Sequence, residues 1–390
     1  MNASKMLVMF VTFYRHQDAT LVTIGDALKS FLDQPDELTK GRCLMAKIDI
    51  DKGPLRWRIK STARPHTDPP PILFQAALQR RWFAAASPKR WCVTLGMCAV
   101  GLIAGASLLG QGVTSLQAYL NGQQSVFSLG FGAVDSRALV NAQLPSGGAS
   151  GLVFAVLLAN LPQALMSFLY LAYNGLLTSM CLCHEYSSYG VRGRRKPLRV
   201  TTRHGQQRRS RQLLPGRDFA NTDVGSTYYL QLPYTYSLPL LLASGTLHWL
   251  TSQSIFLARV TVHANGDPTN TTDTSQIGYS CLPILLVILL GSTMVLIALS
   301  LGFRKFASAI PVAGSCSVAI AAAAHRPKDD VDAAFMPVAW GAVVTEDSSD
   351  VGHCCFTSDD VHEMVPGRRY AGVLGWDDRS LESETHAKGS

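Results

Sequence analysis

Polar residues recur at helical spacing inside two long apolar stretches of the sequence. In the first stretch, five of them fall within an arc of about 80° when residues are plotted at 100° per residue, so they would share one face of a helix. They are Asn160, Gln163, Ser167, Tyr170 and Asn174. Amides are costly in hydrocarbon unless they are paired, so this face should point toward other helices or water. Two interpretations are open: a polar pathway or binding cleft, and hydrogen bonding between helices.

The second stretch carries a histidine on its polar face. Ser237, Ser244, His248 and Ser252 share this face, and His248 is the only ionisable residue of the stretch. A histidine inside an apolar helix is a candidate proton relay or pH-sensitive switch, because its charge changes near neutral pH. A neutral histidine that is hydrogen-bonded to a neighbouring serine or asparagine is the alternative.

Cysteine and histidine gather in two clusters that could bind a metal or accept a modification. The first cluster is Cys181, Cys183, His184 and Glu185, and the second is His353, Cys354 and Cys355. Neither has the Cys-x-x-Cys spacing of zinc sites, so we expect no metal and no cofactor. Cys181 and Cys183 lie where an apolar stretch ends, a position at which cysteines accept palmitoylation. The sequence has no phosphate loop, Gly-x-Gly-x-x-Gly, Gly-x-Ser-x-Gly or His-Glu-x-x-His, so we expect no enzymatic activity.

The polar faces belong to a set of four stretches without Asp, Glu, Lys or Arg. Each stretch is about long enough to cross a bilayer, which needs roughly 20 mostly apolar residues. We expect spans at about 92–110, 151–177, 237–258 and 281–302. The composition, 47% hydrophobic and 16% charged, would also suit an apolar soluble enzyme, but the charges are sorted outside these stretches. The sequence therefore predicts an all-α transmembrane helical bundle with four spans in residues 91–304, in a multi-pass protein of the plasma membrane or an endomembrane.

Charge sorting also predicts the orientation of the chain. The loop 185–226 is strongly basic, and Lys- and Arg-rich loops stay on the cytosolic side. Its basic residues are Arg192, Arg194, Arg195, Lys196, Arg199, Arg203, Arg208, Arg209, Arg211 and Arg217. We expect both chain ends inside and Asn270, in an Asn-x-Thr sequence, outside and open to glycosylation. The net charge of +8 thus points to the lipid bilayer and not to nucleic acid. The basic loop either attracts anionic lipids or serves only to keep this loop on the cytosolic side.

The ends of the chain form separate regions. Residues 1–90 should be a cytosolic region with an amphipathic helix near 19–32, in which Thr23 and Asp26 have the spacing of an N-cap and its partner. Residues 305–376 should form a small cytosolic module with a strand around Trp340. Residues 377–390 should be a disordered tail.

Several runs of sequence are similar to those of a known family. They are LGFGAVDSRALV from Leu129, LLANLPQALMSFLYLAYNGLLTSM from Leu157, RKPLRVTT from Arg195, YYLQLPYTYSLPLL and LHWLTSQSIFLARV, GSCSVAI from Gly314, GHCCFTS from Gly352 and YAG from Tyr370. The chain resembles multi-pass membrane proteins of filamentous fungi whose N-terminal part is a domain of unknown function. The resemblance reaches about Gly372 and implies multi-pass architecture, a fungal source and an unassigned role.

Two departures from the family pattern produce further expectations. Family members look longer at the N-terminus, so this chain would be a partial member in which Met1 to Tyr14 is the end of a lost helix. The family pattern also runs from GQQR almost directly into STYWLQLPY. Here Arg209 to Gly225 intervenes, which we interpret as a retained intron.

Three classes of function compete. The first is a transporter or channel-like protein that uses the polar faces of the second and third spans. The second is a non-catalytic membrane scaffold or sensor that binds partners or anionic lipids through its basic loop and tail. The third, a membrane enzyme with a metal at the cysteine and histidine clusters, has the least support. The sequence names no substrate for any of them.

Overall fold

The chain divides into two compact units. Unit 1 consists of Met1–Ala85, Ser179–Gln231 and Arg304–Ser390, and unit 2 of Ala86–Thr178 and Leu232–Phe303. The computed structural model describes residues 2–15, 21–51, 71–75, 79–120, 131, 148–201, 226–227, 230–263, 271–343 and 351–371. Asn270, the insertion at 209–225 and the tail 377–390 lie outside these described residues.

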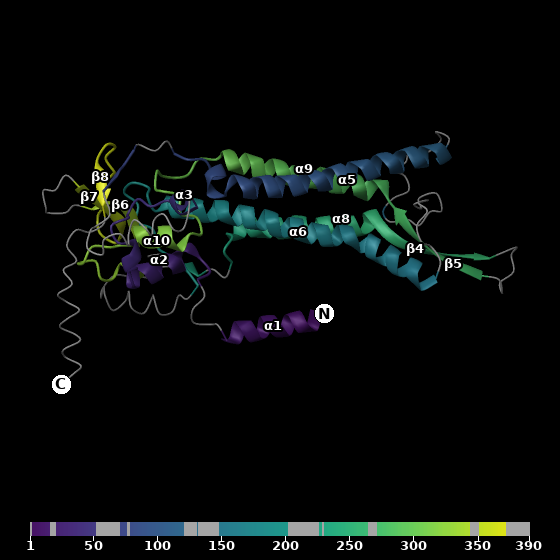
Figure 1. The fold of residues 1–390 in the computed structure, drawn as a ribbon, viewed down its shortest axis with the longest axis horizontal. Coiled ribbons are helices and arrows are strands. Elements are labelled where there is room, and N and C mark those ends of the chain that lie inside the picture. The colour runs from purple at the N-terminus through teal and green to yellow at the C-terminus, as the bar shows by residue number, and fades with distance from the viewer. Residues whose placement is uncertain are drawn as a thin grey trace. The chain divides into compact units, whose positions relative to one another are not determined.

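Unit 2 consists of long helices and one β-hairpin (Figure 1). The helices are α5 (Pro88–Leu120), α6 (Gly148–Ser188, to Thr178 in this unit), α8 (Tyr234–Ser254) and α9 (Cys281–Phe303). Helix α9 packs against both α5 and α8. Strands β4 (Ile255–His263) and β5 (Thr271–Tyr279) pair antiparallel between α8 and α9.

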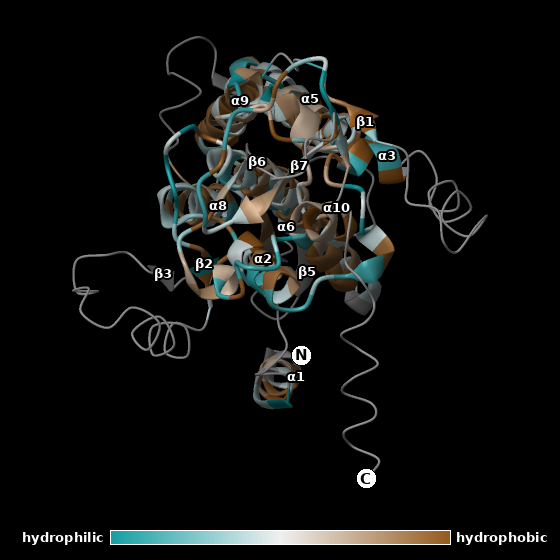
Figure 2. Ribbon diagram, turned by 90° about the vertical axis from the view of Figure 1, so that its left-hand side faces the viewer, coloured by the Kyte–Doolittle hydropathy of each residue, from teal (hydrophilic) through white to brown (hydrophobic). Residues whose placement is uncertain are grey.

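Within the described residues, three helices are long and apolar enough to cross a membrane. They are Pro88–Ala118, Ser150–Ser188 and Cys281–Phe303. Few of their residues are buried, and large apolar side chains such as Val100, Phe168 and Leu296 are each more than 60% exposed. Figure 2 shows the brown, hydrophobic residues on α5 and α9. In water this surface would be strongly unfavourable, at roughly 25 cal/mol per Å².

The prediction of an all-α bundle with four spans is wrong. The expected third span, 237–258, does not form one apolar helix: α8 ends at Ser254, and Ile255 begins strand β4. Polar residues crowd the last turns of α8, so α8 is not among the three apolar helices. The run after it, IFLARVTVH, is rich in β-branched and aromatic residues and pairs with the threonine-rich run of β5. Unit 1 also contains β-sheets, which contradicts the all-α prediction a second time.

Unit 1 is a mixed α/β unit that three distant segments of the chain build together. Its main sheet has four strands in the order β1-β8-β7-β6, with β7 and β8 parallel and the other pairs antiparallel. The strands are β1 (Ile72–Leu73), β6 (Ala339–Val343), β7 (Val351–Thr357) and β8 (Arg369–Ala371), and a second sheet pairs β2 (Arg199–Val200) with β3 (Ser226–Thr227). The helices are α1 (Asn2–Arg15), α2 (Ile24–Asp33), η1 (Glu37–Thr39), α3 (Lys47–Asp51), η2 (Trp82–Ala85), α10 (Ser317–Ala323) and η6 (Ala333–Phe335).

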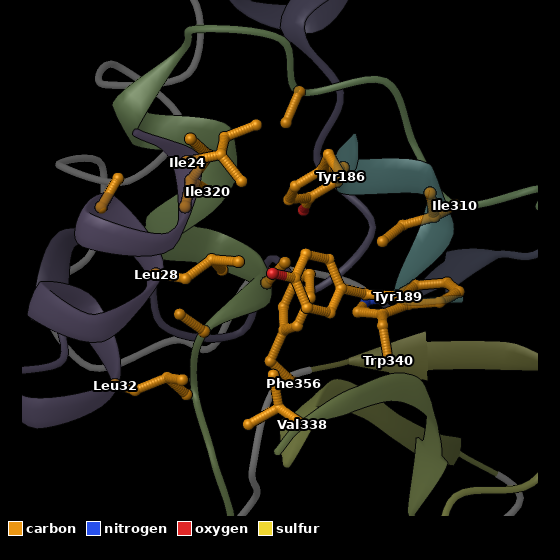
Figure 3. Close-up of a cluster of buried hydrophobic side chains, with 14 of the residues drawn as sticks. Ile24, Leu28, Leu32, Tyr186, Tyr189, Ile310, Ile320, Val338, Trp340 and Phe356 are labelled. Carbon is orange, nitrogen blue, oxygen red and sulfur yellow. The ribbon is translucent and has the colours of Figure 1, made fainter. Parts of the chain in front are cut away.

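The core of unit 1 joins α2, α10, the end of α6 and the sheet (Figure 3). Tyr186 and Tyr189, from the last turn of α6 and just after it, are almost fully buried. Their rings lie 5.3 and 5.7 Å from that of Phe356 in β7. Leu28 of α2 and Trp340 of β6 belong to the same cluster. The last residues of α6 therefore belong to the hydrophobic core of unit 1.

Helix α2 starts as the spacing of Thr23 and Asp26 indicates. The Thr23 hydroxyl accepts from the Asp26 N–H at 3.1 Å, and the Asp26 carboxylate accepts from the Thr23 N–H at 2.9 Å, which completes a capping box. The other Asp26 oxygen accepts from the Thr201 N–H at 2.9 Å, next to strand β2. The cap thus also fixes α2 against residues 199–201.

Gly25 lies in the closest approach between α2 and β2. A Cβ there would collide with the carbonyl group of Arg199. We expect Gly25→Ala to lower the free energy of unfolding of unit 1 by about 1–3 kcal/mol, because the helix must move away from β2. The measurement is denaturant unfolding of the detergent-solubilised protein, followed by the fluorescence of its buried tryptophans.

Gly96→Ala in α5 is the matched control, because a Cβ at Gly96 meets nothing within 4 Å. We expect Gly96→Ala to leave the denaturant concentration at half-unfolding unchanged or to raise it slightly, since alanine favours a helix. Equal midpoints for the two variants would contradict the close contact of α2 with β2.

Candidate functional site

A cavity of about 110 Å³ lies inside unit 2, between α5, α6, α8 and α9. Its walls are mostly apolar. They include Gly101, Leu102, Gly105, Met166, Leu169, Leu247, Val287, Ile288, Gly291 and Val295. The glycines bring the helices close: a Cβ at Gly105 would be 3.3 Å from the Ile288 side chain, and one at Gly291 would be 3.3 Å from that of Leu102. An apolar cavity of about 150 Å³ stays dry and binds a molecule the size of benzene, so this one suits a comparably small guest.

A few polar groups reach the same cavity. Ser244 and His248, one helical turn apart on α8, both line it, as do Cys98 of α5 and Tyr170 of α6. Tyr173 also lines it, but its hydroxyl donates to the Met294 carbonyl of α9 at 3.0 Å and so holds two walls together. A mostly apolar cavity with a small number of placed polar groups is typical of small-molecule sites.

Of the five residues on the polar face of α6, Tyr170 lines this cavity and the other four do not. Asn160 and Ser167 are exposed, and each donates to a carbonyl of its own helix, that of Val156 at 2.7 Å and that of Gln163 at 3.2 Å. Gln163 and Asn174 are half-buried and do not line the cavity. The expectation that this face points into the bundle therefore fails for Asn160 and Ser167.

The physical reason is the glycine face of α5. A Cβ at Gly101 would be in ordinary contact with Leu169, at 3.6 Å. This close packing turns the side of α6 that carries Leu169, Tyr170 and Tyr173 toward the cavity. Of the polar residues predicted to share a site, the structure brings together Tyr170, Ser244 and His248.

The cysteine clusters are buried in unit 1. Cys181 and Cys183 are only 5% and 3% exposed, so their thiols are not accessible for palmitoylation. Cys354 and Cys355 are fully buried in β7. In the described part of the chain, no three His, Cys, Asp or Glu side chains are placed to share a metal ion.

The first residues of the basic loop hold unit 1 together. Arg199 forms an ion pair of 2.7 Å with Glu185, and both side chains are about nine-tenths buried. The Lys196 ammonium donates to the Ser188 hydroxyl at 2.9 Å and lies 5.3 Å from the centre of the Tyr189 ring. Burial lowers the pKa of Lys196, although Glu185 opposes this. The buried and paired Arg199 side chain is therefore unavailable to lipids.

The comparison with known families decides where this chain belongs. A family model described as Domain of unknown function (DUF8419) matches residues 23–71 and 60–372. The chain belongs to this family. The DUF8419 domain thus extends far beyond an N-terminal part and covers elements of both units, from the cap of α2 to the end of β8. No curated protein and no solved structure matches the chain.

Two buried histidines tie the C-terminal strands of this DUF8419 protein to the rest of unit 1. His353 places Nδ1 3.1 Å from the Ala371 carbonyl and Nε2 3.0 Å from the carbonyl of His325. His325 in turn bonds to the Thr39 hydroxyl at 2.9 Å. Sequence reasoning placed His353 in a metal cluster and missed His325, which lies alone in an alanine-rich run and gave no signal.

Burial sets the protonation of this pair. It lowers the pKa of His325 to about 4, and the nearby His353 adds to the effect. Burial also lowers the pKa of His353, against the two carbonyl groups, which favour a protonated ring. Both rings are therefore neutral at pH 7, and His353 then donates to only one of its two carbonyl partners.

Unit 1 of the DUF8419 protein should lose stability in acid. Between an unfolded pKa of about 6.5 and the lowered folded values, the unfolded chain binds more protons, so stability is full above about 6.5 and falls as the pH drops toward 4. From His325 alone we expect a loss of roughly 3 kcal/mol over this interval. The loss of stability is measured by comparing the midpoints of denaturant unfolding at pH 7 and pH 4.5.

A pair of histidine variants isolates the source of this loss. His325→Gln should make the midpoint less dependent on pH, whereas His362→Gln, at an exposed position, should leave the dependence unchanged. An unchanged dependence in His325→Gln would exclude His325 as the acid-sensitive group.

Proposed function

We propose that this protein is an integral membrane protein that inserts the apolar helices α5, α6 and α9 into the bilayer and binds a small, largely apolar solute in the cavity of unit 2. The proposal places it with transporter- or channel-like proteins and assigns it no catalysis. The three apolar helices with exposed side chains support the membrane part. The bilayer would remove from water the apolar surface that unit 2 leaves uncovered.

The cavity is the observation that carries the proposal. A guest that fits it has an apolar body about the size of one aromatic ring, because the walls are apolar and the volume is about 110 Å³. His248, Ser244 and Tyr170 supply hydrogen-bonding groups at the wall. We therefore expect a guest with one hydroxyl or N–H group, such as a phenol or an indole.

The role of the polar residues changes accordingly. His248 is the candidate binding residue, through a ring nitrogen that donates or accepts according to its tautomer. Asn160, Gln163, Ser167 and Asn174 lie off the cavity, so they have no part in this binding. A proton relay through His248 would need a chain of polar groups, and the cavity walls are mostly apolar.

A scaffold or sensor is the second candidate. Arg192 and Arg194 of the basic loop are exposed, and so is Glu363, whose carboxylate lies 3.6 Å from Arg192. This mixed-charge surface would suit a protein partner of the basic loop and tail. Replacement of Arg192 and Arg194 by glutamine would then weaken partner binding, whereas His248→Leu would not.

Membrane insertion is tested first. We expect the expressed protein to stay in the membrane pellet after extraction with alkaline carbonate and to leave it only with detergent, because α5, α6 and α9 place long apolar surfaces in the hydrocarbon. A peripheral membrane protein is the control for complete extraction. Release of the chain by carbonate would reject the membrane proposal.

Thermal unfolding of the detergent-purified protein tests the cavity. Indole or phenol at about ten times its Kd should stabilise the parent by about 1.4 kcal/mol, which raises the Tm by a few degrees. His248→Leu should weaken the effect about tenfold in ligand concentration, because it removes one hydrogen bond.

Ser252→Ala is the matched control. Ser252 shares the polar face of α8, but its hydroxyl donates to the Trp249 carbonyl of its own helix at 2.7 Å and it does not line the cavity. Its response to indole should equal that of the parent. Absence of any Tm shift in the parent with either compound would reject the cavity as a binding site.

A further inference from the structure

Two cysteines that lie far apart in the sequence meet in the core of unit 1. Cys43 follows η1, and Cys354 lies in strand β7. Both belong to the hydrophobic cluster of this unit, both carry free thiols, and they are 2% and 0% exposed. The Cys354 thiol forms a hydrogen bond with the sulfur of Cys43. The fold thus brings together two thiols between which the chain makes every long helix of unit 2.

The backbone of the sheet holds both thiols in place. The Cys43 thiol donates to the Ala371 carbonyl of β8 at 3.2 Å, and His353 places Nδ1 3.1 Å from the same oxygen. The register of β7 and β8 sets His353 opposite Ala371, and Cys354 is the next residue along β7. On its other side, Cys354 pairs with Ala342 of β6. The contact between the two sulfur atoms is therefore a product of strand pairing.

Cys355, the next residue of β7, does not belong to this pair. Successive side chains of a strand point to opposite faces. Cys355 is also fully buried, but it is not part of the hydrophobic cluster that contains Cys43 and Cys354. Consecutive Cα atoms are about 3.8 Å apart, below the range of about 4.4–6.8 Å in which disulfides form. Cys354 therefore has Cys43 as its better partner.

The hydrogen bond between the two thiols makes them chemically unequal. The bond from Cys354 lowers the pKa of Cys43, against burial, which raises it. Burial raises the pKa of Cys354, and the bond with Cys43 adds to this effect. The thiolate is the form of cysteine that attacks an oxidant. Cys43 is therefore the thiol that reacts first, and Cys354 is placed to react with the product.

We infer that Cys43 and Cys354 form a modification site, a reversible disulfide produced by a small hydroperoxide. The Cys43 sulfur attacks one peroxide oxygen, so that an S–O bond forms, the O–O bond breaks, and the other oxygen leaves as water or alcohol with the thiol proton. The Cys354 sulfur then attacks the sulfenic acid of Cys43, so that the S–S bond forms and water leaves with the second thiol proton. The two sulfurs lose two electrons, which reduce the hydroperoxide.

The disulfide would lock the fold of unit 1. It closes a loop from residue 43 to residue 354, and a crosslink over a long loop stabilises mainly by restricting the unfolded chain. Oxidation removes the proton that Cys43 donates to Ala371, but the carbonyl keeps the His353 ring at 3.1 Å. The inference concerns unit 1 alone, so it depends neither on membrane insertion nor on the cavity of unit 2.

Peptide mapping of the full chain tests the site. The reduced, detergent-purified protein is treated with hydrogen peroxide, its remaining thiols are blocked with N-ethylmaleimide, and an unreduced digest is analysed by mass spectrometry. We expect one linked pair of peptides, in which Cys43 is joined to Cys354 with the loss of two hydrogen atoms. The Tm should rise by several degrees, and dithiothreitol should reverse both changes.

Cysteine variants assign the two roles. Cys43→Ser should abolish the link and the rise in Tm, while its hydroxyl keeps a donor for the Ala371 carbonyl. Cys354→Ala should also abolish both, and dimedone should then trap the Cys43 sulfenic acid, which has no second thiol to react with. Cys355→Ala is the matched control, because it removes an adjacent, equally buried thiol of β7 and should keep both responses.

Several outcomes would overturn the site. They are full recovery of free thiols in the parent after peroxide, a link from Cys43 to another cysteine, and equal loss of the link in Cys355→Ala. The chain unfolded in urea is the reference for chance pairing, and the same mixture of links from the folded protein would also reject the pair. Release of the chain by carbonate, or no Tm shift with indole or phenol, would instead count against the proposed function and leave this site intact.

Discussion

The buried ion pair of Arg199 and Glu185 is the contact on which unit 1 depends. It joins the last turn of α6 to strand β2 at 2.7 Å, and the same arginine donates to the Gln231 carbonyl at 2.9 Å, just before α8. Its own carbonyl accepts from the Thr23 hydroxyl of the α2 cap at 2.5 Å. Two charges removed from water stabilise a fold only when their geometry is good and their remaining hydrogen bonds are met. Here three parts of the chain converge on one arginine.

Unit 2 depends on a different constraint. Lipid-facing helices gain little from hydrophobic burial against each other, so close packing and small residues must hold them. Gly105 and Gly291 provide that close approach, and the cavity is the space that remains where larger residues would otherwise fill the bundle. The same glycines thus account both for the association of the helices and for the volume available to a guest.

The sequence allowed correct prediction of those features that depend on local physics. The capping box of Thr23 and Asp26 follows from residue spacing, and three of the apolar helices follow from length and the absence of charge. The β4–β5 hairpin was missed because the apolar run through Ile255 to Ala258 reads equally well as helix or strand. The rotation of α6, which leaves Asn160 outside the cavity, depends on glycines in another helix. The β-bridge between Arg81 and Lys305 joins residues far apart in the sequence, and no local pattern predicts it.

The assembly of unit 1 from three separated segments has a consequence for biogenesis. Cys43, near the start, donates through its thiol to the Ala371 carbonyl, 328 residues later in the chain, at 3.2 Å. Strand β1 likewise pairs only with β8, through Tyr370 and Arg369, which are made near the end of this sequence. During synthesis, β1 therefore lacks its partner strand until every one of these apolar helices has been made, and α2 can pack against β2 but not against α10 before α9 is made. Contacts of such long sequence separation form slowly. The N-terminal segment therefore leaves apolar core residues uncovered until the C-terminal strands have been made, and a contiguous fragment of unit 1 is a poor choice for separate expression.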